Sequence, residues 1–280
     1  MGFHSRMWTR DGSLIGMFES TATTETDDRA FGAVAPYYDE LMASVPYGYW
    51  LDYIEKVWER HGQSPRRVLD LACGTGTMTR RLHAHGYDVV GSDLSAGMLD
   101  SARRRTAGAG IEIPFYEQDA AELDLGEPRF DAVICLFDSL NYITEPERLR
   151  SAFARVRAHL APVGSFLFDV NTEFALEQGM FNQSCTRKDE PLHYRWRSSY
   201  DPETRLCTVR MRFEYDTGDG VPDVFHEVHV QRAYAKEELK EWLVAAGFAK
   251  VTLYDAYTLR APRRRSDRIF VMAECGEREA

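Results

Sequence analysis

The stretch from Val68 to Asp93 reads VLDLACGTGTMTRRLHAHGYDVVGSD. In it an apolar run carries Asp70, a turn contains Gly74 and Gly76, and a second apolar run ends at Asp93. This order predicts a strand, a tight turn, a helix and a second strand that delivers the Asp93 carboxylate. Because Asp93 follows Gly76 by 17 residues, it suits a carboxylate that accepts hydrogen bonds from the ribose hydroxyls of a nucleoside. The stretch therefore predicts a pocket for a nucleoside-containing ligand.

The residues around the glycines argue against two common kinds of nucleotide site. A dinucleotide-binding turn needs a third glycine where this chain has Thr79, and no Gly-Lys-Ser/Thr sequence follows the turn as in a phosphate-binding loop. Asp70 stands just before the turn, where its carboxylate would repel a pyrophosphate but hold an ammonium group. We therefore expect a ligand that lacks phosphates and carries an amino-acid ammonium.

At these residues the chain resembles the class I S-adenosylmethionine-dependent methyltransferases. Three further segments follow in the family's order: QDA at 118–120, FDAVICLFDSLNY at 130–142 and GSFLFDVN at 164–171. They look like the family's adenine-binding segment, its fourth strand with the wall beneath the methionine, and its fifth strand. The resemblance covers residues 37–171. It implies S-adenosylmethionine as the methyl donor and S-adenosylhomocysteine as the product.

The pattern of apolar segments predicts an α/β fold. Strands and helices alternate over residues 67–171, which indicates a doubly wound, seven-stranded, mostly parallel sheet of the Rossmann-like methyltransferase type. Alternating polar and apolar residues at 193–200, 207–215 and 224–234 then predict an antiparallel sheet, followed by a helix at 236–246 and strands at 251–258 and 269–273. We expect a flexible tail over 1–30, a donor-binding domain over 31–171 and 233–280 that begins with a helical lid, and an antiparallel β insertion over 172–232 that caps the active site.

Composition limits the partners and the compartment. The net charge of −10 opposes a nucleic-acid partner, which needs clustered Lys and Arg against phosphate. The five cysteines form no CxxC pair and have no His at metal spacing, so we expect free thiols and no metal site. No apolar run has the length of a membrane span. These features predict a cytoplasmic enzyme without membrane association, and a homodimer is left open.

The resemblance implies donor contacts from the lid, the glycine turn and the ends of the following strands. They fall on Tyr38, Tyr47, Trp50, Asp70, Ala72, Cys73, Gly74, Thr75, Gly76, Asp93, Leu94, Met98, Asp119, Ala120, Leu136 and Ser139.

Methyl transfer from a sulfonium mainly requires that the acceptor lone pair is held in line with the methyl group. Such placement supplies roughly 7 to 11 kcal/mol of the barrier reduction, and an aromatic face or a positioned base adds less. The catalytic candidates are Tyr38, Asp138, Asn141 and His229, and the acceptor-binding candidates are Tyr142, Asn171 and Arg268. In an ideal strand His226 and His229 point to opposite faces, so one pocket can receive only one of them.

The predicted function is methyl transfer to a nitrogen, or an oxygen, of a small metabolite. CLFDSLNYI with RMRFEYD and HEVHVQRAY looks similar to small bacterial methyltransferases that include N-methyltransferases of nucleotide-linked amino sugars. The chain also looks like glycine and sarcosine N-methyltransferases, but it shows no counterpart of their arginine clamp. The alternatives are a non-catalytic S-adenosylmethionine-binding scaffold and a nicotinamide-dependent oxidoreductase. A nucleic-acid methyltransferase is disfavoured because Asp138-Ser139-Leu140-Asn141 replaces the Asp/Asn-Pro-Pro-Tyr/Phe motif.

Overall fold

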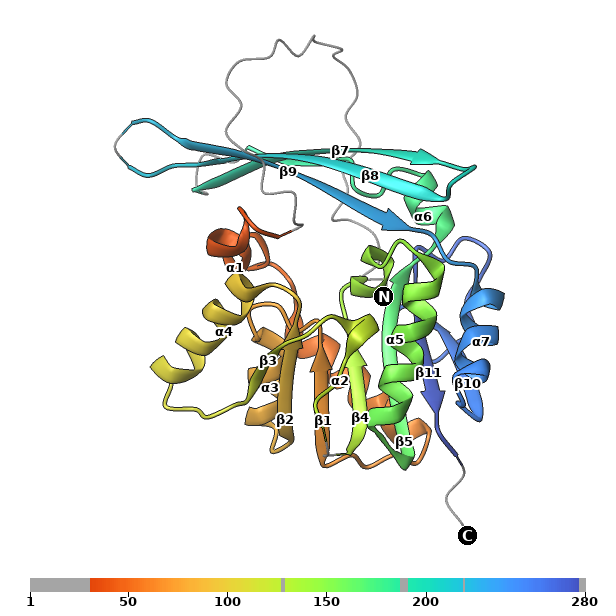
Figure 1. Ribbon diagram of the computed structural model, residues 1–280. Helices are drawn as coiled ribbons and strands as arrows, with labels where there is room; N and C mark the ends of the chain where they lie inside the picture. Colours follow the sequence, from red (N-terminus) through yellow and green to blue (C-terminus); the bar gives the residue numbers. More distant parts are fainter. Residues whose placement is uncertain (1–30, 127–128, 187–190, 219, 277–280) are drawn as a thin grey trace.

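A computed structural model describes residues 31–126, 129–186, 191–218 and 220–276 (Figure 1). The tail predicted over residues 1–30 lies outside the described residues. The described chain forms two sheets, a larger one flanked by helices and a smaller antiparallel one, with a short helical segment between them (Figure 1). No helix in the described ranges is both long and apolar enough to cross a membrane.

The larger sheet has seven strands in the order β10-β11-β5-β4-β1-β2-β3. Their bounds are β1 Arg67–Leu71, β2 Asp88–Asp93, β3 Phe115–Glu117, β4 Phe130–Cys135, β5 Leu160–Asn171, β10 Lys250–Asp255 and β11 Arg268–Glu274. All neighbouring pairs are parallel except those that β11 makes with β5 and β10. The predicted seven-stranded, mostly parallel sheet is therefore confirmed, and its strand order reverses next to β1, where α/β proteins bind ligands.

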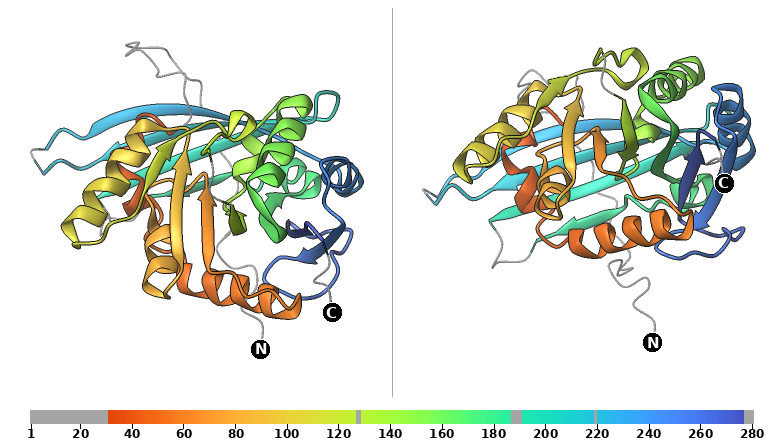
Figure 2. Two further views of the ribbon diagram at one scale, coloured as in Figure 1. Left: turned by 60° about the horizontal axis from the view of Figure 1, so that its bottom comes forward. Right: turned by 90° about the horizontal axis from the view of Figure 1, so that it is seen from below.

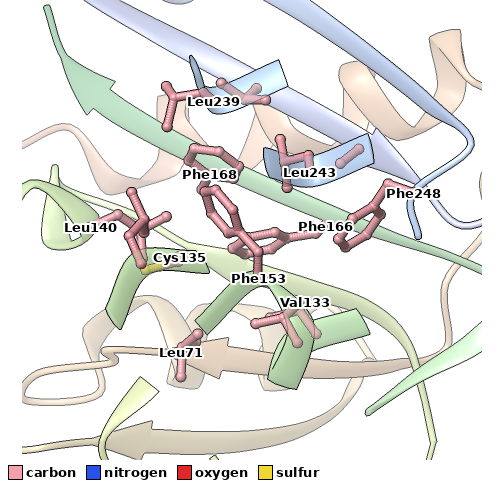
Figure 3. Close-up of a cluster of buried hydrophobic side chains, with 14 of the residues drawn as sticks. Leu71, Val133, Cys135, Leu140, Phe153, Phe166, Phe168, Leu239, Leu243 and Phe248 are labelled. Carbon is pink, nitrogen blue, oxygen red and sulfur yellow. The ribbon is translucent and has the colours of Figure 1, made fainter. Parts of the chain in front are cut away.

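Helices cover both faces of this sheet, as parallel strands require. Their bounds are α2 Tyr47–Arg60, α3 Thr77–Ala84, α4 Ala96–Gly108, α5 Pro146–His159 and α7 Lys236–Ala245. One face packs against α5 and α7, where Phe153 and Leu243 point toward Phe166 and Phe168 of β5 (Figure 3). The other face packs against α2 and α3, so α2 and α5 lie on opposite sides of the sheet (Figure 2).

The smaller sheet lies across the carboxyl ends of the parallel strands (Figure 1). It consists of β6 Gln183–Cys185, β7 Leu192–Asp201, β8 Leu206–Tyr215 and β9 Asp223–Arg232, in that order and all antiparallel. A short helix, α6 Glu173–Glu177, connects β5 to it. Its inner face buries Val209, Met211 and Phe213 together with Val34 and Leu176. We call it the cap sheet.

The segment before α2 enters between the cap sheet and the turn after β1. It contains a 3-10 turn, η1 Ala35–Tyr37, and one helical turn, α1 Tyr38–Leu41, so this part of the predicted helical lid has very little helix. We call residues 31–45 the lid.

Several predicted element ends differ from the structure by a few residues. Helix α4 begins at Ala96, because Ser95 is its N-cap and its Oγ accepts the Met98 N–H. The strand predicted to reach Thr258 ends at Asp255, before the left-handed residue Tyr257 at φ 57°. The third strand ends at Glu117, ahead of the 118–120 segment.

Candidate active site

The turn after β1 is attached to the end of β2 by the carboxylate of Asp93. One oxygen accepts the Gly74 N–H and the other accepts the Ser95 N–H, both at 2.8 Å. Each carboxylate oxygen can accept a further hydrogen bond. The carboxylate is therefore already oriented at the mouth of the turn, and its remaining lone pairs fit the two hydroxyls of a ribose.

Asp70 is a buried carboxyl at the end of β1 that lacks a cationic partner among the described residues. It is 2% exposed, and one of its oxygens accepts the hydroxyl of Thr79 at 2.6 Å. Burial raises the pKa of Asp70 to about 7. An ammonium group bound beside it would replace the lost hydration, so the residue fits the amino-acid end of S-adenosylmethionine. Thr79, which argued against a dinucleotide site, orients this carboxyl.

The lid closes directly over the glycine turn. A Cβ atom added to Gly74 would meet the Tyr38 ring at 4.0 Å, and the Thr75 hydroxyl donates to Asp39 at 2.5 Å. Asp39 also pairs with Arg105 of α4. Burial raises the pKa of Tyr38 well above its usual value, so its hydroxyl stays protonated at neutral pH.

An aromatic wall follows β4. The ring of Phe137 stacks on Trp50 of α2 with centroids 4.2 Å apart, and Tyr47 lies 5.2 Å from Phe137. Phe137 and Asp138 are left-handed, at φ 60° and 52°, which is uncommon outside glycine. The predicted lid residues Tyr47 and Trp50 thus pack on the loop after β4, and Tyr38 covers the turn.

Asp169 of β5, which was not predicted as a site residue, holds this strained loop. Its two oxygens accept the backbone N–H groups of Phe137 and Asp138 at 2.8 and 3.0 Å. Arg268 pairs with Asp169 and, at 2.7 Å, with Asp138. Although burial opposes its charge, the two carboxylates raise the pKa of Arg268 above its usual value. An acidic residue inside the apolar run GSFLFDVN was the signal in the sequence.

Polar side chains from three elements converge beside Asp138. Gln231 of β9 donates to Asp138 at 2.5 Å and accepts from the Asn171 amide at 3.1 Å. The side-chain oxygen of Asn171 is buried without a hydrogen-bond partner. A buried carbonyl oxygen without a partner costs free energy, so it is a suitable acceptor for a ligand N–H or O–H. The predicted residues Asp138, Asn171 and Arg268 therefore lie together.

Asn141 has a different environment from the other candidates. Its side-chain amide donates to the backbone oxygens of Asn171 and Arg232, and its oxygen accepts the Asn171 N–H. It is 0% exposed. These bonds join the loop after β4 to β5 and β9. The geometry therefore favours a role for Asn141 in positioning these elements over the catalytic role predicted for it.

Tyr142 forms a hydrogen-bonded row with the buried residues His229 and Glu227 of the cap sheet. Tyr142 Oη lies 3.0 Å from His229 Nδ1, and His229 Nε2 lies 2.6 Å from a Glu227 oxygen. The other Glu227 oxygen accepts the Val34 N–H at 2.8 Å. Because a carboxylate only accepts, Nε2 carries the proton, and Nδ1 is free to accept the Tyr142 hydroxyl. His226 is exposed, as strand alternation predicts.

The residues predicted to lie on the adenine side of the donor differ in their exposure. Leu94, directly after β2, is 65% exposed, whereas Met98 of α4 is buried. Asp119 accepts the Ala121 N–H at 2.8 Å and pairs with Arg148 at 2.5 Å, so its carboxylate is already engaged. The remaining predicted contacts are placed as follows: Ala120 begins the turn after Asp119, Leu136 is buried after β4, Ser139 donates to the Leu136 oxygen, Gly76 is left-handed at the start of α3, and Ala72 is left-handed in the turn.

Within the described residues, neither the cysteines nor a group of metal-binding side chains adds a reactive centre to this site. All five cysteines are free. Burial raises the pKa of the Cys73 thiol well above its usual value, which disfavours a nucleophilic thiolate. Within the described ranges no three metal-binding side chains converge.

Comparison with known proteins agrees with this geometry. Residues 68–164 match the family described as a methyltransferase domain. YqeM of Bacillus subtilis, whose methyltransferase activity is itself inferred, is 34% identical over 240 residues, 86% of this chain and 95% of that protein. The dTDP-3-amino-3,6-dideoxy-alpha-D-glucopyranose N,N-dimethyltransferase of Streptomyces fradiae is 34% identical over 150 residues, 53% of this chain and 57% of that protein. An S-adenosylmethionine-dependent methyltransferase of Clostridium acetobutylicum superposes with a TM-score of 0.77 at 28% identity, over 89% of this chain and all of that chain.

The fold, the glycine turn and these relatives together define the class. The chain belongs to the class I S-adenosylmethionine-dependent methyltransferases, and its methyl donor is S-adenosylmethionine.

Proposed function

We propose that this enzyme methylates a nitrogen of a small-molecule metabolite under the cap sheet. The observation that carries the proposal is the set of hydrogen-bond acceptors beside the lid: the Asp138 carboxylate and the unpartnered Asn171 oxygen. Acceptors on the enzyme match N–H or O–H groups on the substrate, so they fit an amine that also carries hydroxyls. The Streptomyces fradiae relative, named for dimethylation of an amino sugar, supports the same choice.

We further propose that residues 172–232 form the cap that encloses the acceptor, with Tyr142 and Arg268 beside it. Gln231 and Arg268 hold Asp138 from two sides, so its carboxylate keeps a fixed direction. The Tyr38 ring lies beside Gly74, and Phe31, which packs on Tyr38, also packs on Tyr142. Tyr38 would therefore contact both donor and acceptor, and the donor supplies a methyl group on a sulfonium.

The row Tyr142-His229-Glu227 gives the acceptor nitrogen a route for its proton. An amine that arrives protonated has no lone pair for attack. Tyr142 can accept that proton while its own hydroxyl proton passes to His229 Nδ1, because Glu227 stabilises the resulting imidazolium. Burial raises the pKa of Tyr142 well above its usual value, so the hydroxyl relays a proton and is not a stable phenolate.

The first test is binding followed by an acceptor screen. Calorimetric titration should show binding of S-adenosylmethionine and S-adenosylhomocysteine but not of NAD. Labelled donor is then offered with panels of amino sugars, other amines and phenols. Methylation of amines supports the proposal. Turnover of phenols alone would move the target to oxygen, and donor binding without turnover of any panel would favour a scaffold.

The proton route is tested with Glu227→Gln. The new amide can donate to His229 Nε2 and so favours the tautomer with the proton on Nδ1, which cannot accept from Tyr142. We expect kcat to fall about 10²-fold or more, the size of a lost general base, while donor affinity stays within about twofold. Glu227→Gln and His229→Asn should both remove the limb of the pH–rate profile that reports the proton acceptor. An unchanged profile in both variants would exclude the route but not the methyltransferase activity.

A further inference from the structure

Four arginines lie side by side on the outer face of the cap sheet, away from the larger sheet. Arg195 of β7 pairs in register with Arg212 of β8, and two residues along Arg197 pairs with Arg210. Met211, which lies between Arg210 and Arg212 on β8, points to the inner face of the cap sheet and is buried. Three of the arginines are exposed and Arg212 is half-buried. We call this group the outer arginine face.

The outer arginine face sets like charges against each other, which weakens the sheet, and its positive charge is opposite in sign to the net charge of the chain. Like charges directly opposite each other on neighbouring strands are destabilising. Among the residues that the structure describes, Glu214 is the only carboxylate that pairs with any of the four, and it pairs with Arg212. The face is therefore positive on a chain whose net charge is −10. Such a cluster indicates an anionic partner.

The spacing of the face identifies the shape of that partner. Same-face positions along a strand are about 6.6 to 6.8 Å apart, which is also the distance between alternate side chains of an extended peptide. Carboxylates at every second residue of an extended segment would meet the two arginine pairs in register. Each guanidinium can hold a carboxylate through two parallel hydrogen bonds.

The strand next to the face carries two exposed valines on either side of His226. Val224 and Val228 of β9 are 39% and 53% exposed, and Val228 is the register partner of Arg210. When every second side chain of an extended segment faces the arginines, the intervening side chains point away from the sheet, so the two valines border the segment without contacting them. We propose that the outer arginine face binds an extended acidic segment of a partner protein, independently of the methyl-transfer site.

Other anionic partners fit these observations less well. A DNA-binding protein typically makes six to ten phosphate contacts, and four arginines on an acidic chain provide fewer. A second copy of the chain placed by a two-fold axis over this face would set arginine against arginine. An anionic lipid surface would attract the four arginines but would repel the rest of the acidic chain.

The proposal is tested with a labelled octapeptide in which glutamate alternates with serine. We expect the full chain to bind it with an affinity that falls as salt rises. Arg197→Gln with Arg210→Gln should weaken binding about tenfold, corresponding to the loss of two exposed charge contacts. The matched control, Arg264→Gln with Arg265→Gln, removes the same charge from two exposed residues elsewhere and should bind as wild type. S-adenosylmethionine binding should be unchanged in both variants.

Three results would overturn the proposal. They are no binding of the peptide by the wild type, an equal loss of binding in the control variant, and tighter binding of a single-stranded oligonucleotide or of phosphatidylserine vesicles than of the peptide. A correctly folded double variant is established by its melting temperature, which should equal or exceed that of the wild type because one like-charge pair has been removed.

Discussion

Asp70 connects stability with ligand recognition in a single side chain. It is buried, its pKa is raised to about 7 by that burial, and its neighbour Thr79 supplies a hydroxyl but no positive charge. Without a bound cation the ionised carboxylate is therefore unfavourable, and with a bound ammonium it becomes favourable. A residue of this kind is retained for binding at a cost to the stability of the free protein.

Asp70→Asn should separate these two effects. At pH 8 the neutral amide avoids burial of a charge while it still accepts from Thr79, so the free protein should gain on the order of 2 to 4 kcal/mol. Its melting temperature should rise by at least about 4 °C. Affinity for S-adenosylmethionine should fall about 10- to 100-fold, the loss of one charge-assisted hydrogen bond. Scanning calorimetry measures the melting temperature, and calorimetric titration measures the affinity for S-adenosylmethionine. An unchanged affinity would mean that the ammonium group of the donor binds elsewhere.

Gly91 of β2 has no room for a side chain. A Cβ there would lie 2.5 Å from the Phe115 ring and 3.0 Å from the Cys73 sulfur. Gly91→Ala should therefore destabilise the fold by about 1 to 3 kcal/mol and, because Asp93 lies two residues on, weaken donor binding. Gly108→Ala at the end of α4, where nothing lies within 4 Å, is the control and should be neutral or stabilising. Equal melting temperatures for the two variants would contradict this packing.

The donor side and the acceptor side of the candidate site differ in how far the sequence predicts them. Gly74, Asp93 and Asp70 lie within one strand-turn-helix-strand unit, so their spacing alone places them. Gln231 contacts Asp138 across 93 positions of the chain. Asp169, Glu227 and Gln231 were not predicted, because such contacts depend on how the cap sheet and β11 approach the loop after β4. No local periodicity encodes that approach.

At the scale of elements, the lid and the cap sheet form one packing unit. The buried cluster of the cap contains Phe213, Val34 and Leu176, and Glu227 accepts the Val34 N–H. The order and type of the strands follow from their apolar periodicity, which is why these elements could be predicted. The shortness of α1 could not, because the lid owes its conformation to the sheet that covers it.

Phe213→Ala tests that coupling. Phe213 is 0% exposed, and its removal should destabilise the cap by about 3 to 5 kcal/mol. If lid and cap open together, amide exchange should accelerate in residues 31–41 and in β7 to β9, while β1, β4 and β5 stay protected. Phe166→Ala, in the core beneath α5, should instead affect the larger sheet. Faster exchange in the cap with an unchanged lid would show that the two open separately.

For the whole molecule, Asp70 predicts opposite pH dependences for folding and for donor binding. Between the usual value of 3.8 and the folded value of about 7, the folded state binds the proton that the unfolded state has lost. The contribution of Asp70 to stability is therefore fully present below pH 4 and is lost as the pH rises toward 7 and above. Donor binding needs the ionised carboxylate, so it should strengthen over the same upper range.

The increase in melting temperature caused by S-adenosylmethionine should therefore be larger at pH 8 than at pH 5.5. A ligand at 100 times its Kd stabilises a protein by about 2.7 kcal/mol, and a weaker Kd at low pH reduces that gain. Other carboxyls also titrate, but the difference between wild type and Asp70→Asn isolates this one, since the variant should show a ligand-induced increase that hardly depends on pH. The same pH dependence in both proteins would assign the proton to a different group and leave the donor's ammonium without its predicted partner.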